Sequence, residues 1–463
     1  QKITNPRFAM YRLARSKYAL PLVLLVLGLV SRFAFIWHPR EVVFDETHFG
    51  KFINAYFTGE YFFDIHPPLG KLLIALAGYI GGFEPGFGFE AIGEPYPDGA
   101  YIALRVVPNL FGAMLVPCVY LFVLSLKGSR MAAMLAGLAV ALENALLVQS
   151  HFILLDSAFL FFGFGGLALF FFYRNYPRRT VYLIGAGVFL GCAFSVKWTG
   201  LSFLGLGLAV ALWDLTQGKY RMREVVSSAL ALVVLPILIN FSVFTVHFYL
   251  LDKSGPGNAF MSERFNKTLV GSNTEHDPNI EPLGFAAKFQ ELNKTMFTSN
   301  VSLGKKHPYA SPFYTWPVMA RSVYYWNDPQ SSDGQSRVYL TGNPMVWWLA
   351  LGMTAAGLFL WWPSRAETKW ILYFGWVMNV LPFYNIERVM FQYHYFPALI
   401  FSIVIMGMYF SDALDDYRKY RTALFVALVA LFYLGFIFFA PLTYGFPLSE
   451  KQFLWRIWFK GWM

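Results

Sequence analysis

The sequence has few charged residues for its length. Only 14% of its 463 residues are Asp, Glu, Lys or Arg, whereas 57% are hydrophobic and 19% are aromatic. Soluble globular domains carry roughly 25% charged residues, and a single soluble core stops growing beyond about 250–300 residues. Apolar runs of near-membrane length recur along this chain instead, and a spanning helix needs about 20 apolar residues. The composition therefore excludes an ordinary soluble enzyme and predicts an integral membrane protein.

Cysteine is scarce, and the common cofactor motifs are missing. Cys118 and Cys192 each lie in an apolar run and are expected to be small core residues, not a disulfide or a thiolate metal site. No phosphate-binding Gly-rich loop or dinucleotide fingerprint follows a strand, so a soluble nucleotide donor is not indicated. The net charge of +10 is spread over short runs between apolar segments. A basic stripe is absent, so no nucleic-acid partner is predicted.

Hydropathy predicts an all-α polytopic protein with about eleven transmembrane helices. They are expected near residues 18–37, 101–126, 131–149, 152–173, 180–196, 198–215, 225–248, 345–362, 370–384, 393–411 and 422–441. The first of these is too long for the apolar core of a signal peptide, and no small-residue cleavage site follows it. A shorter run at 69–83 opens with Pro-Pro and is expected to be a re-entrant or interfacial helix, or else a short span.

Three parts of the chain follow from this pattern. The first, residues 1–248, is an N-terminal membrane module that includes an acidic first external loop at 38–100. A large external segment covers 249–344, and further membrane helices with an interfacial tail cover 345–463. The tail, "KQFLWRIWFKGWM", alternates aromatic residues with cations and is expected to anchor at the membrane surface.

Basic residues predict the orientation in the membrane. With eleven helices, the connections "LKGSRM", "YRNYPRRT", "QGKYRMRE", "PSRAETK" and "DYRKYR" fall on the same side as the basic N-terminal tail. Short cytoplasmic loops carry an excess of Lys and Arg, so this side is predicted to be cytoplasmic. Nearly all the unusual polar residues then lie at the opposite, extracytoplasmic face. That arrangement is expected of an enzyme whose substrate arrives through the bilayer.

Ionisable residues are concentrated in the first external loop. The stretch "VVFDETHFGKFINAYFTGEYFFDIHPPLGK" contains Asp45, Glu46, His48, Asp64 and His66. Adjacent acids are often no more than a solvated loop, but Asp45 follows Val-Val-Phe and precedes an aromatic segment. Partial burial there would raise the pKa of a carboxyl toward that of a general base. The cluster matches no closed metal motif, and a site for Mg²⁺ or Mn²⁺ is left as an open alternative.

Charged residues also occur within or beside predicted spans. Asp156 in "HFILLDSAFLFF" is either a functional carboxylate or the start of a helix, because a buried charge at a helix centre costs roughly 2.5–3.5 kcal/mol. Glu143 is assigned no role beyond pairing with a cation. A single cation at the predicted outer face is explained if its aliphatic stem is buried and its charged head reaches water. Several such cations together could hold a phosphate. The cations are Arg32, Arg105, Lys197 and Arg388.

Several motifs, taken in order, resemble the protein O-mannosyltransferase family. They are "VFDETHFGKF", "DIHPPLGKLLIALAGY", "ALRVVPNLFGAMLVPCVYL", "LLDSAFLFF", "VKWTGL", "TGNPMVWW" and "QYHYFPAL". The resemblance runs from about residue 32 to about residue 410 and implies the GT-C glycosyltransferase fold. It further implies a dolichyl- or polyprenyl-phosphate mannose donor, a Ser or Thr hydroxyl of a secreted polypeptide as acceptor, and inversion at the sugar.

The resemblance also implies roles for individual residues. Asp45 matches the general base and Glu46 a supporting residue, while Arg105 and Arg32 fall where the family has arginines. Charge and predicted side, not a motif role, suggest Lys197 and Arg388 as phosphate ligands. Phosphate leaves readily when fixed cations stabilise it, so one carboxylate suffices for inversion. The remaining site candidates are His48, Asp64, His66, Asp156, Trp198, Tyr393 and His394.

The chain departs from eukaryotic members in its external segment. They carry a β-trefoil MIR domain there, whereas 249–344 is expected to be too short and too irregular for one. The chain thus resembles a prokaryotic-type member. One alternative is a related transferase that moves another sugar, such as aminoarabinose, to a lipid or glycan. A transporter is a remote alternative, because we find no repeat between the two halves of the sequence.

Overall fold

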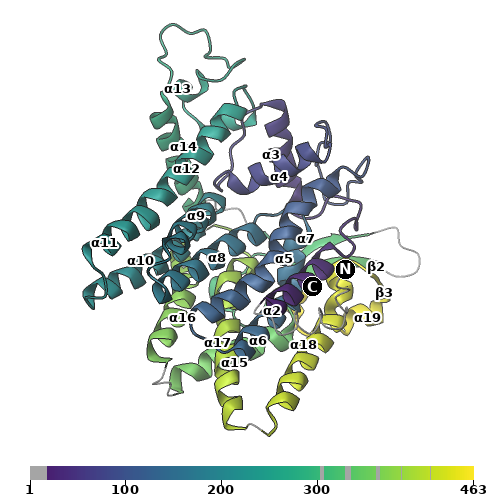
Figure 1. The fold of residues 1–463 in the computed structure, drawn as a ribbon. Helices are drawn as coiled ribbons and strands as arrows, with labels where there is room; N and C mark the ends of the chain where they lie inside the picture. Colours follow the sequence, from purple (N-terminus) through teal and green to yellow (C-terminus); the bar gives the residue numbers. More distant parts are fainter. Residues whose placement is uncertain (1–17, 303–306, 329–334, 361–364, 387, 418) are drawn as a thin grey trace, which may run out of the picture.

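The computed structural model describes residues 18–302, 307–328, 335–360, 365–386, 388–417 and 419–463, and helices dominate them (Figure 1). The α-helices are α2 (Ala19–Phe33), α3 (Glu46–Thr58), α4 (Leu69–Ile80), α5 (Tyr101–Ser125), α6 (Arg130–Ala141), α7 (Asn144–His151), α8 (Asp156–Asn175), α9 (Thr180–Val196), α10 (Leu201–Thr216), α11 (Met222–Ala229), α12 (Leu235–Leu250), α13 (Glu263–Asn266), α14 (Phe285–Ser302), α15 (Pro344–Phe359), α16 (Ala366–Met378), α17 (Phe396–Asp416), α18 (Arg421–Tyr444) and α19 (Glu450–Leu454).

Short helical turns and a small sheet complete the structure. The 3₁₀ turns are η1 (Trp198–Gly200), η3 (Pro256–Phe260), η4 (Phe313–Thr315), η6 (Leu381–Asn385), η7 (Gln392–Tyr395) and η8 (Lys460–Trp462), and η2 (Leu230–Val234) is a π-helix that joins α11 to α12. The strands are β1 (Val323–Asn327), β2 (Gln335–Leu340) and β3 (Pro447–Leu448), paired antiparallel in that order.

The prediction of a helical polytopic membrane protein is confirmed, and each of the eleven predicted segments contains a helix. By length and composition, six helices in the described residues could cross a membrane, or seven if one bent pair forms a single span. The six are Tyr101–Ser125, Asp156–Asn175, Trp198–Thr216, Met222–Leu250, Gln392–Leu414 and Arg421–Tyr444. Four apolar helices are shorter, namely α2, α4, α9 and α15. Hydropathy counted apolar turns with the helices, so several expected spans are longer than the helices in them.

The bent pair corrects the expectation of one continuous helix at 131–149. α6 and α7 meet at 56°. Glu143 precedes α7 and caps it, because its Oε2 accepts from the backbone N–H of Leu146 at 2.7 Å. Its Oε1 accepts from the backbone N–H of Asn343 at 2.7 Å, just before α15. The expected pairing of Glu143 with a cation is therefore replaced by a double capping role that joins two distant helices.

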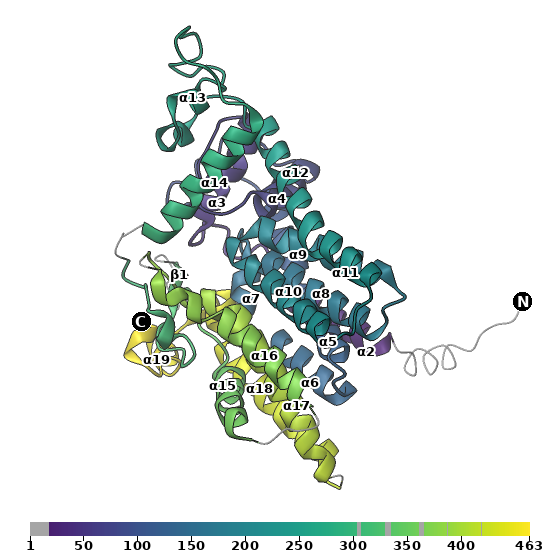
Figure 2. The same ribbon diagram turned by 90° about the vertical axis from the view of Figure 1, so that its left-hand side faces the viewer.

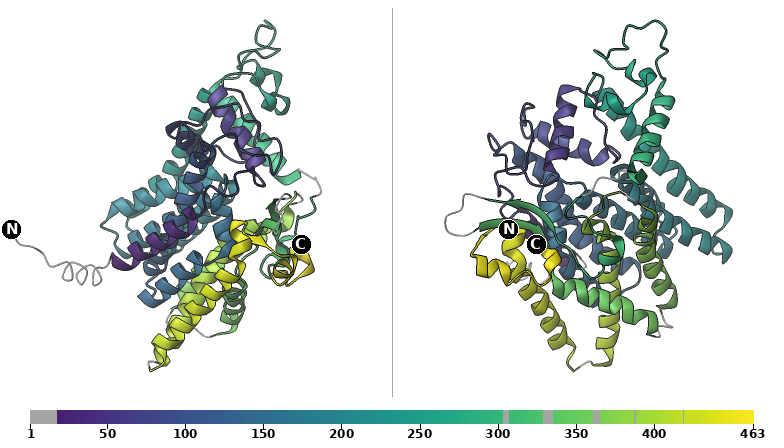
Figure 3. Two further views of the ribbon diagram at one scale, coloured as in Figure 1. Left: turned by 90° about the vertical axis from the view of Figure 1, so that its right-hand side faces the viewer. Right: turned by 180° about the vertical axis from the view of Figure 1, so that it is seen from behind.

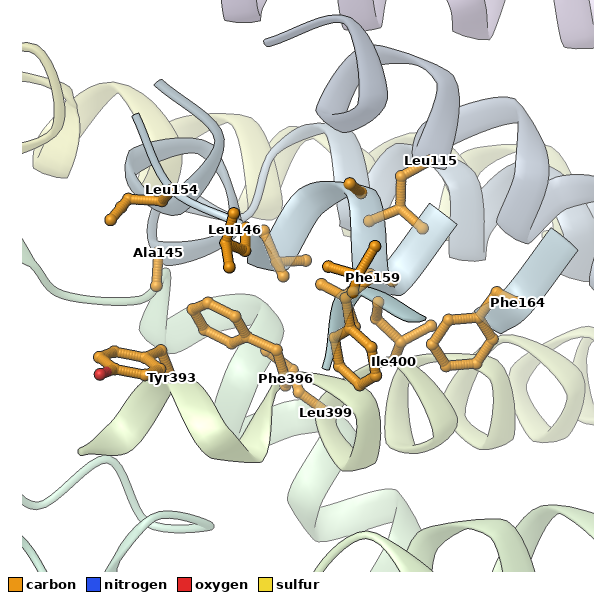
Figure 4. Close-up of a cluster of buried hydrophobic side chains, with 14 of the residues drawn as sticks. Leu115, Ala145, Leu146, Leu154, Phe159, Phe164, Tyr393, Phe396, Leu399 and Ile400 are labelled. Carbon is orange, nitrogen blue, oxygen red and sulfur yellow. The ribbon is translucent and has the colours of Figure 1, made fainter. Parts of the chain in front are cut away.

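The core lies where α5 and α8 pack between α2, α9 and α17. Close approach of α2 to α5 requires Gly28, because a Cβ there would lie 2.6 Å from the carbonyl oxygen of Ala113. Small residues allow such backbone contact between membrane helices. Figure 4 shows Phe159 and Phe164 of α8 packed against Phe396 and Ile400 of α17, with the Tyr393 ring at the edge of the cluster. The apolar core thus extends to the residues just before α17.

The external segment is more ordered than its sequence suggested. It contains the 18-residue helix α14 and the β1–β2 hairpin, not the irregular structure expected for 249–344. Figures 1 and 2 show α3, α13 and α14 at one end of the molecule and the turn between α17 and α18 at the other. Figure 3 shows the green hairpin beside the yellow C-terminal residues.

The C-terminal tail only partly fits the expected interfacial anchor. Trp455 and Trp458 are exposed, as an anchor requires. Trp462 is fully buried, and its Nε1 donates to the carbonyl oxygen of Met319 at 2.7 Å. The C-terminal residues therefore pack against the 249–344 segment, and the bond from Trp462 fixes that segment at Met319.

Candidate active site

Asp45 lies at the junction between an irregular loop and a helix. It is the residue before α3, and the preceding Phe44 has a positive φ of 43°, which is uncommon for a residue other than glycine. Strand β1 supports this conformation. The Phe44 N–H donates to the carbonyl oxygen of Tyr325 at 3.1 Å, and the two rings stack at 4.3 Å. The direction in which Asp45 points is thus fixed by a residue 280 positions later in the sequence.

The surroundings of Asp45 make it a suitable base. Burial raises the pKa of its carboxyl to about 7, the Lys197 ammonium acts against that rise, and the Asp156 and Asp64 carboxylates add to it. A carboxylate with a pKa near neutral pH combines a useful ionised fraction with enough basicity to take a proton from a hydroxyl. Burial thus acts on the pKa of Asp45 in the direction that the sequence analysis expected, and the role of Asp45 as a base stays a prediction.

Glu46, the next residue, has a different environment. Its side chain is completely buried, and its carboxylate accepts hydrogen bonds from both Nε and Nη2 of Arg105, each at 2.9 Å. It also accepts from the hydroxyl of Tyr96 and the N–H of Val43, both at 2.9 Å, and from the N–H of Ile153 at 3.1 Å. Glu46 therefore joins the loop before α3 to α5 through Arg105, and to the connection between α7 and α8 through Ile153.

Two cavities share part of their walls, and Asp45 lines the larger of them. The larger, about 380 Å³, is lined by Asp45, His48, Phe49, Phe52, Phe63, Asp64, Ile65, His66, Phe260, Arg388, Val389, Phe391, Tyr393 and His394. The smaller, about 40 Å³, is lined by His66, Asp156, Phe159, Lys197, Trp198, Thr199, Asn300, Asn379, Phe383, Arg388, Tyr393, His394 and Pro397. We call them the acidic cavity and the cationic cavity. The walls of the two cavities contain Asp45 and nine further candidates from the sequence analysis, which are His48, Asp64, His66, Asp156, Lys197, Trp198, Arg388, Tyr393 and His394.

In the cationic cavity, Lys197 is held between an acid and a ring. Its Nζ donates to Asp156 Oδ1 at 2.7 Å and lies 5.5 Å from the centre of the Tyr393 ring. Asp156 is also the first residue of α8, as the helix-start reading expected, and a functional role for its carboxylate stays a prediction. Its second oxygen, Oδ2, accepts from Gln149 Nε2 at 2.7 Å. Lys197 is therefore buried and held in position by Asp156.

Arg388 and His394 form a second group shared by both cavities. Arg388 Nη2 lies 3.1 Å from His394 Nε2, and His394 Nδ1 lies 2.9 Å from the carbonyl oxygen of Phe391. Because a guanidinium can only donate, Nε2 accepts and Nδ1 carries the proton. Arg388 Nε and Trp198 Nε1 are buried N–H groups without a hydrogen-bond partner among the described residues. Such groups are donors available to a bound anion.

Lys71 organises the acidic side of the site and was not selected from the sequence. It pairs with Asp64 and donates to the carbonyl oxygens of His66 at 2.8 Å and Pro67 at 3.3 Å. Burial, with Lys197, Arg388 and Lys71 nearby, holds the pKa of His66 well below its usual range. His66 is thus a neutral ring on the wall that the two cavities share, and Lys71 fixes the His-Pro-Pro turn.

Two arginines do not have the expected position. Arg32 donates to the carbonyl oxygens of Ala141 at 2.8 Å and Val140 at 2.9 Å, at the end of α6, where helix carbonyls lack partners. Arg105 is fully buried against Glu46. Neither residue lines the two cavities. The expectation that Arg32 and Arg105 bind a phosphate directly is therefore corrected, and both stabilise the scaffold around Asp45.

A bound metal is not supported by the arrangement of side chains. Within the part of the chain that the structure describes, no three His, Cys, Asp or Glu residues are grouped so that they could hold a metal ion. Asp64 and Asp156, the two acids whose charges act on Asp45, are already paired with lysines. We therefore derive no chemical step through a metal, and the Mg²⁺ or Mn²⁺ alternative remains a matter for experiment.

Comparison with known proteins identifies the family. The model of the dolichyl-phosphate-mannose-protein mannosyltransferase family matches residues 22–252, and that of the C-terminal four-transmembrane region of protein O-mannosyltransferase matches 285–462. Dolichyl-phosphate-mannose–protein mannosyltransferase 3 of Saccharomyces cerevisiae is 34% identical over 300 residues, 61% of this chain and 40% of that protein. Protein O-mannosyl-transferase 2 of Danio rerio is 32% identical over 57% of this chain and 37% of that protein. The matched part is well under half the length of these relatives.

Solved structures agree with this assignment at the level of the fold. The S. cerevisiae Pmt1–Pmt2 complex bound to the sugar donor has a TM-score of 0.89 at 20% identity, covering 96% of this chain and 92% of that one. ArnT of Cupriavidus metallidurans bound to undecaprenyl phosphate has a TM-score of 0.54 at 14% identity, covering 93% and 77%. These similarities place the chain in the GT-C fold. Together with the two family models, they show that this chain belongs to the protein O-mannosyltransferase family.

Proposed function

We propose that this chain transfers mannose from a dolichyl- or polyprenyl-phosphate carrier to Ser or Thr hydroxyls of secreted polypeptides, with inversion at the sugar. The observation that supports it best is the placement of Asp45, whose carboxyl has a pKa of about 7, beside a cavity that carries Lys197 and Arg388. A base and a phosphate-binding cation are the two groups this reaction needs. Membership of the family supplies the sugar and the acceptor class.

In this mechanism Asp45 takes the proton of the acceptor hydroxyl. The hydroxyl oxygen forms a bond to C1 of mannose while the bond from C1 to the phosphate oxygen breaks. The electron pair of that bond leaves with the polyprenyl phosphate, and the proton stays on Asp45. Attack opposite the leaving group inverts the sugar, so no covalent intermediate with the enzyme is required.

The cationic cavity is suited to the leaving phosphate. Lys197 and Arg388 are held cations on its wall, and Trp198 Nε1 and Arg388 Nε are buried donors without a partner among the described residues. Preorganised donors stabilise charge that grows in the transition state without reorganising at the moment of reaction. A phosphate held there needs no general acid. His66 and His394 border both cavities, where the sugar would lie. We assign His66 to hydrogen bonding of the sugar hydroxyls, because both ring nitrogens of His394 are already bonded to Arg388 and Phe391.

The same proposal gives an orientation and a division of the chain. The N-terminus is cytoplasmic, and the two cavities face the extracytoplasmic side. Residues 1–248 carry Asp45 and Lys197, the segment 249–344 covers the site, and 345–463 supplies Arg388, Tyr393 and His394. The lipid carrier enters from the bilayer and the polypeptide from the aqueous side.

The experiment is sugar transfer by the purified protein in detergent. Radiolabelled polyprenyl-phosphate mannose and a Ser/Thr-rich peptide are supplied, with a parallel sample in chelator. We expect mannosyl-peptide with an α linkage, formed equally in the chelated sample. Transfer only to a lipid or glycan acceptor would move the chain to the alternative transferase class. Solute uptake into sealed vesicles without sugar transfer would favour a transporter.

The pH dependence of transfer follows from the raised pKa of Asp45. The base acts in its ionised form, which is lost as the pH falls through about 7. We therefore expect kcat/KM to rise with pH and reach half its maximum near pH 7, and not near the ordinary value of an aspartate. The measurement is the pH profile at subsaturating donor.

A variant tests whether the fall of kcat/KM at low pH is due to protonation of Asp45. Among the charges around Asp45, Lys197 lowers its pKa while Asp156 and Asp64 raise it. Lys197→Met should therefore move the midpoint to higher pH, in addition to reducing the rate. Lys253→Met, which removes an exposed lysine bonded to the carbonyl oxygen of Thr58, should leave the midpoint in place. A midpoint near pH 4 in the wild type would contradict the assignment.

A further inference from the structure

Tyr325 of β1 makes contacts on both sides of the site. Its carbonyl oxygen accepts from the N–H of Phe44 at 3.1 Å, and its ring stacks on Phe44 at 4.3 Å. Its hydroxyl donates to Oε1 of Gln149, a residue of α7. Tyr325 therefore contacts the residue before Asp45 and, through a separate group, a helix of the membrane domain.

The second contact continues to Lys197. Gln149 Nε2 donates to Asp156 Oδ2 at 2.7 Å, and Asp156 Oδ1 accepts from Lys197 Nζ at 2.7 Å. Each member of this row is shielded from solvent, with Tyr325 at 0%, Gln149 at 2%, Asp156 at 6% and Lys197 at 7% exposure. We call Tyr325, Gln149, Asp156 and Lys197 the buried row.

The order of donors and acceptors in the buried row is determined at one end. The carboxylate oxygen of Asp156 accepts, so the NH₂ group of the Gln149 amide faces Asp156 and the amide oxygen faces Tyr325, whose hydroxyl donates to it. The reverse orientation would place the amide oxygen against the Asp156 carboxylate, which is repulsive. If the hydroxyl is removed, Gln149 Oε1 is a buried acceptor without this partner, and the amide is held only at its Asp156 end.

We propose that Tyr325 and Gln149 are positioning residues that fix the Lys197 ammonium through Asp156, so that the external segment couples the general base to the phosphate-binding cation. This inference rests on the proposed function, in which Lys197 faces the donor phosphate. The backbone and ring of Tyr325 hold Phe44, the residue before Asp45. Its hydroxyl acts on Lys197 through Gln149 and Asp156. The two effects can therefore be separated by changing the hydroxyl alone.

Tyr325→Phe is the variant that tests it, because it keeps the stacked ring and the backbone hydrogen bond. Loss of a buried hydrogen bond that orders a charged group should lower kcat/KM for the lipid donor about tenfold, with KM for the peptide unchanged. Tyr324→Phe is the matched control. Its hydroxyl is bonded to Asn327 on the same strand and is not part of the buried row, so its activity should equal that of the wild type.

A second background separates positioning from general damage. In Lys197→Met, the group that Tyr325 is proposed to position is absent, so Tyr325→Phe should have no further effect on the remaining activity. Residues that act as one unit are non-additive in this way. A full tenfold loss in both backgrounds would overturn the proposal, because it would show that the hydroxyl acts on the structure and not through Lys197.

Binding of the unglycosylated carrier keeps this test independent of catalysis. We would measure the affinity for polyprenyl phosphate of the same four proteins, which are the wild type, the two single variants and the double variant. Tyr325→Phe should weaken binding about tenfold in the wild-type background and not at all with Lys197→Met. A protein that transfers no mannose but shows this coupling would refute the proposed function and support the inference. Equal losses in both backgrounds would refute the inference alone.

Discussion

Asp45→Asn should abolish most of the transfer activity while leaving the protein folded. The amide has nearly the same shape as the carboxyl but cannot accept the hydroxyl proton, and general-base catalysis contributes roughly 10²- to 10⁴-fold. We expect kcat to fall by that factor, with little change in the affinity for polyprenyl phosphate, because Asp45 lines the acidic cavity and not the cationic one. The measurement is initial rate against donor and peptide concentration.

The control for this variant is another acid of the same loop. Glu90 is exposed, and its partner is the exposed Lys51 at 2.8 Å. Surface pairs contribute little to stability, so Glu90→Gln should change neither kcat nor folding. If Asp45→Asn retained wild-type activity, Asp45 would not be the base, and the role of the first external loop would have to be reassigned.

The second large effect concerns stability. Arg105→Met leaves the Glu46 carboxylate buried at 0% exposure without its charge partner. Removing one member of a buried pair typically costs about 3–5 kcal/mol, because the remaining charge has no compensation. We expect Arg105→Met to lower the free energy of unfolding by that amount, measured by equilibrium unfolding in mixed micelles. Activity should fall as well, because Glu46 is adjacent to Asp45.

A double variant shows whether the lone charge causes the loss. Combining Arg105→Met with Glu46→Gln removes both charges, and the double variant should be more stable than Arg105→Met alone. Lys51→Met, which breaks the exposed pair with Glu90, should shift stability by less than about 0.5 kcal/mol. Equal stability of the wild type and Arg105→Met would show that Glu46 is protonated or solvated, contrary to the structure.

Much of the fold and part of the site followed from the sequence. Apolar runs predicted each helical membrane segment, because burial in lipid demands about 20 apolar residues wherever the segment lies in the fold. Asp45, Asp156 and Lys197 were selected because ionisable groups are costly beside a membrane and are kept where they act. These inferences need only local composition, and the tertiary structure is consistent with all three residues lying at one site.

The break between α6 and α7 was not predictable in the same way. The run at 131–149 is apolar except for Glu143, Asn144 and Gln149, and hydropathy treats so few polar residues as a tolerable exception. The break is stabilised by the N–H of Asn343, 200 residues away in the sequence. A side chain that caps one helix and bonds to the start of another therefore gives no local signal.

The sequence by itself determined that the chain is a helical membrane protein, and it predicted an acidic site in the loop after the first helix. Only the tertiary structure decided which charged residues line a cavity and which are paired away from it. Asp45 and Glu46 are neighbours with the same chemistry, but successive residues at a helix start point about 100° apart. One carboxylate reaches a cavity and the other reaches Arg105. Arg32 and Arg388 differ likewise only in their partners, and Tyr325 meets Gln149 across 176 residues. Long-range packing sets these partners, so no local pattern can reveal them.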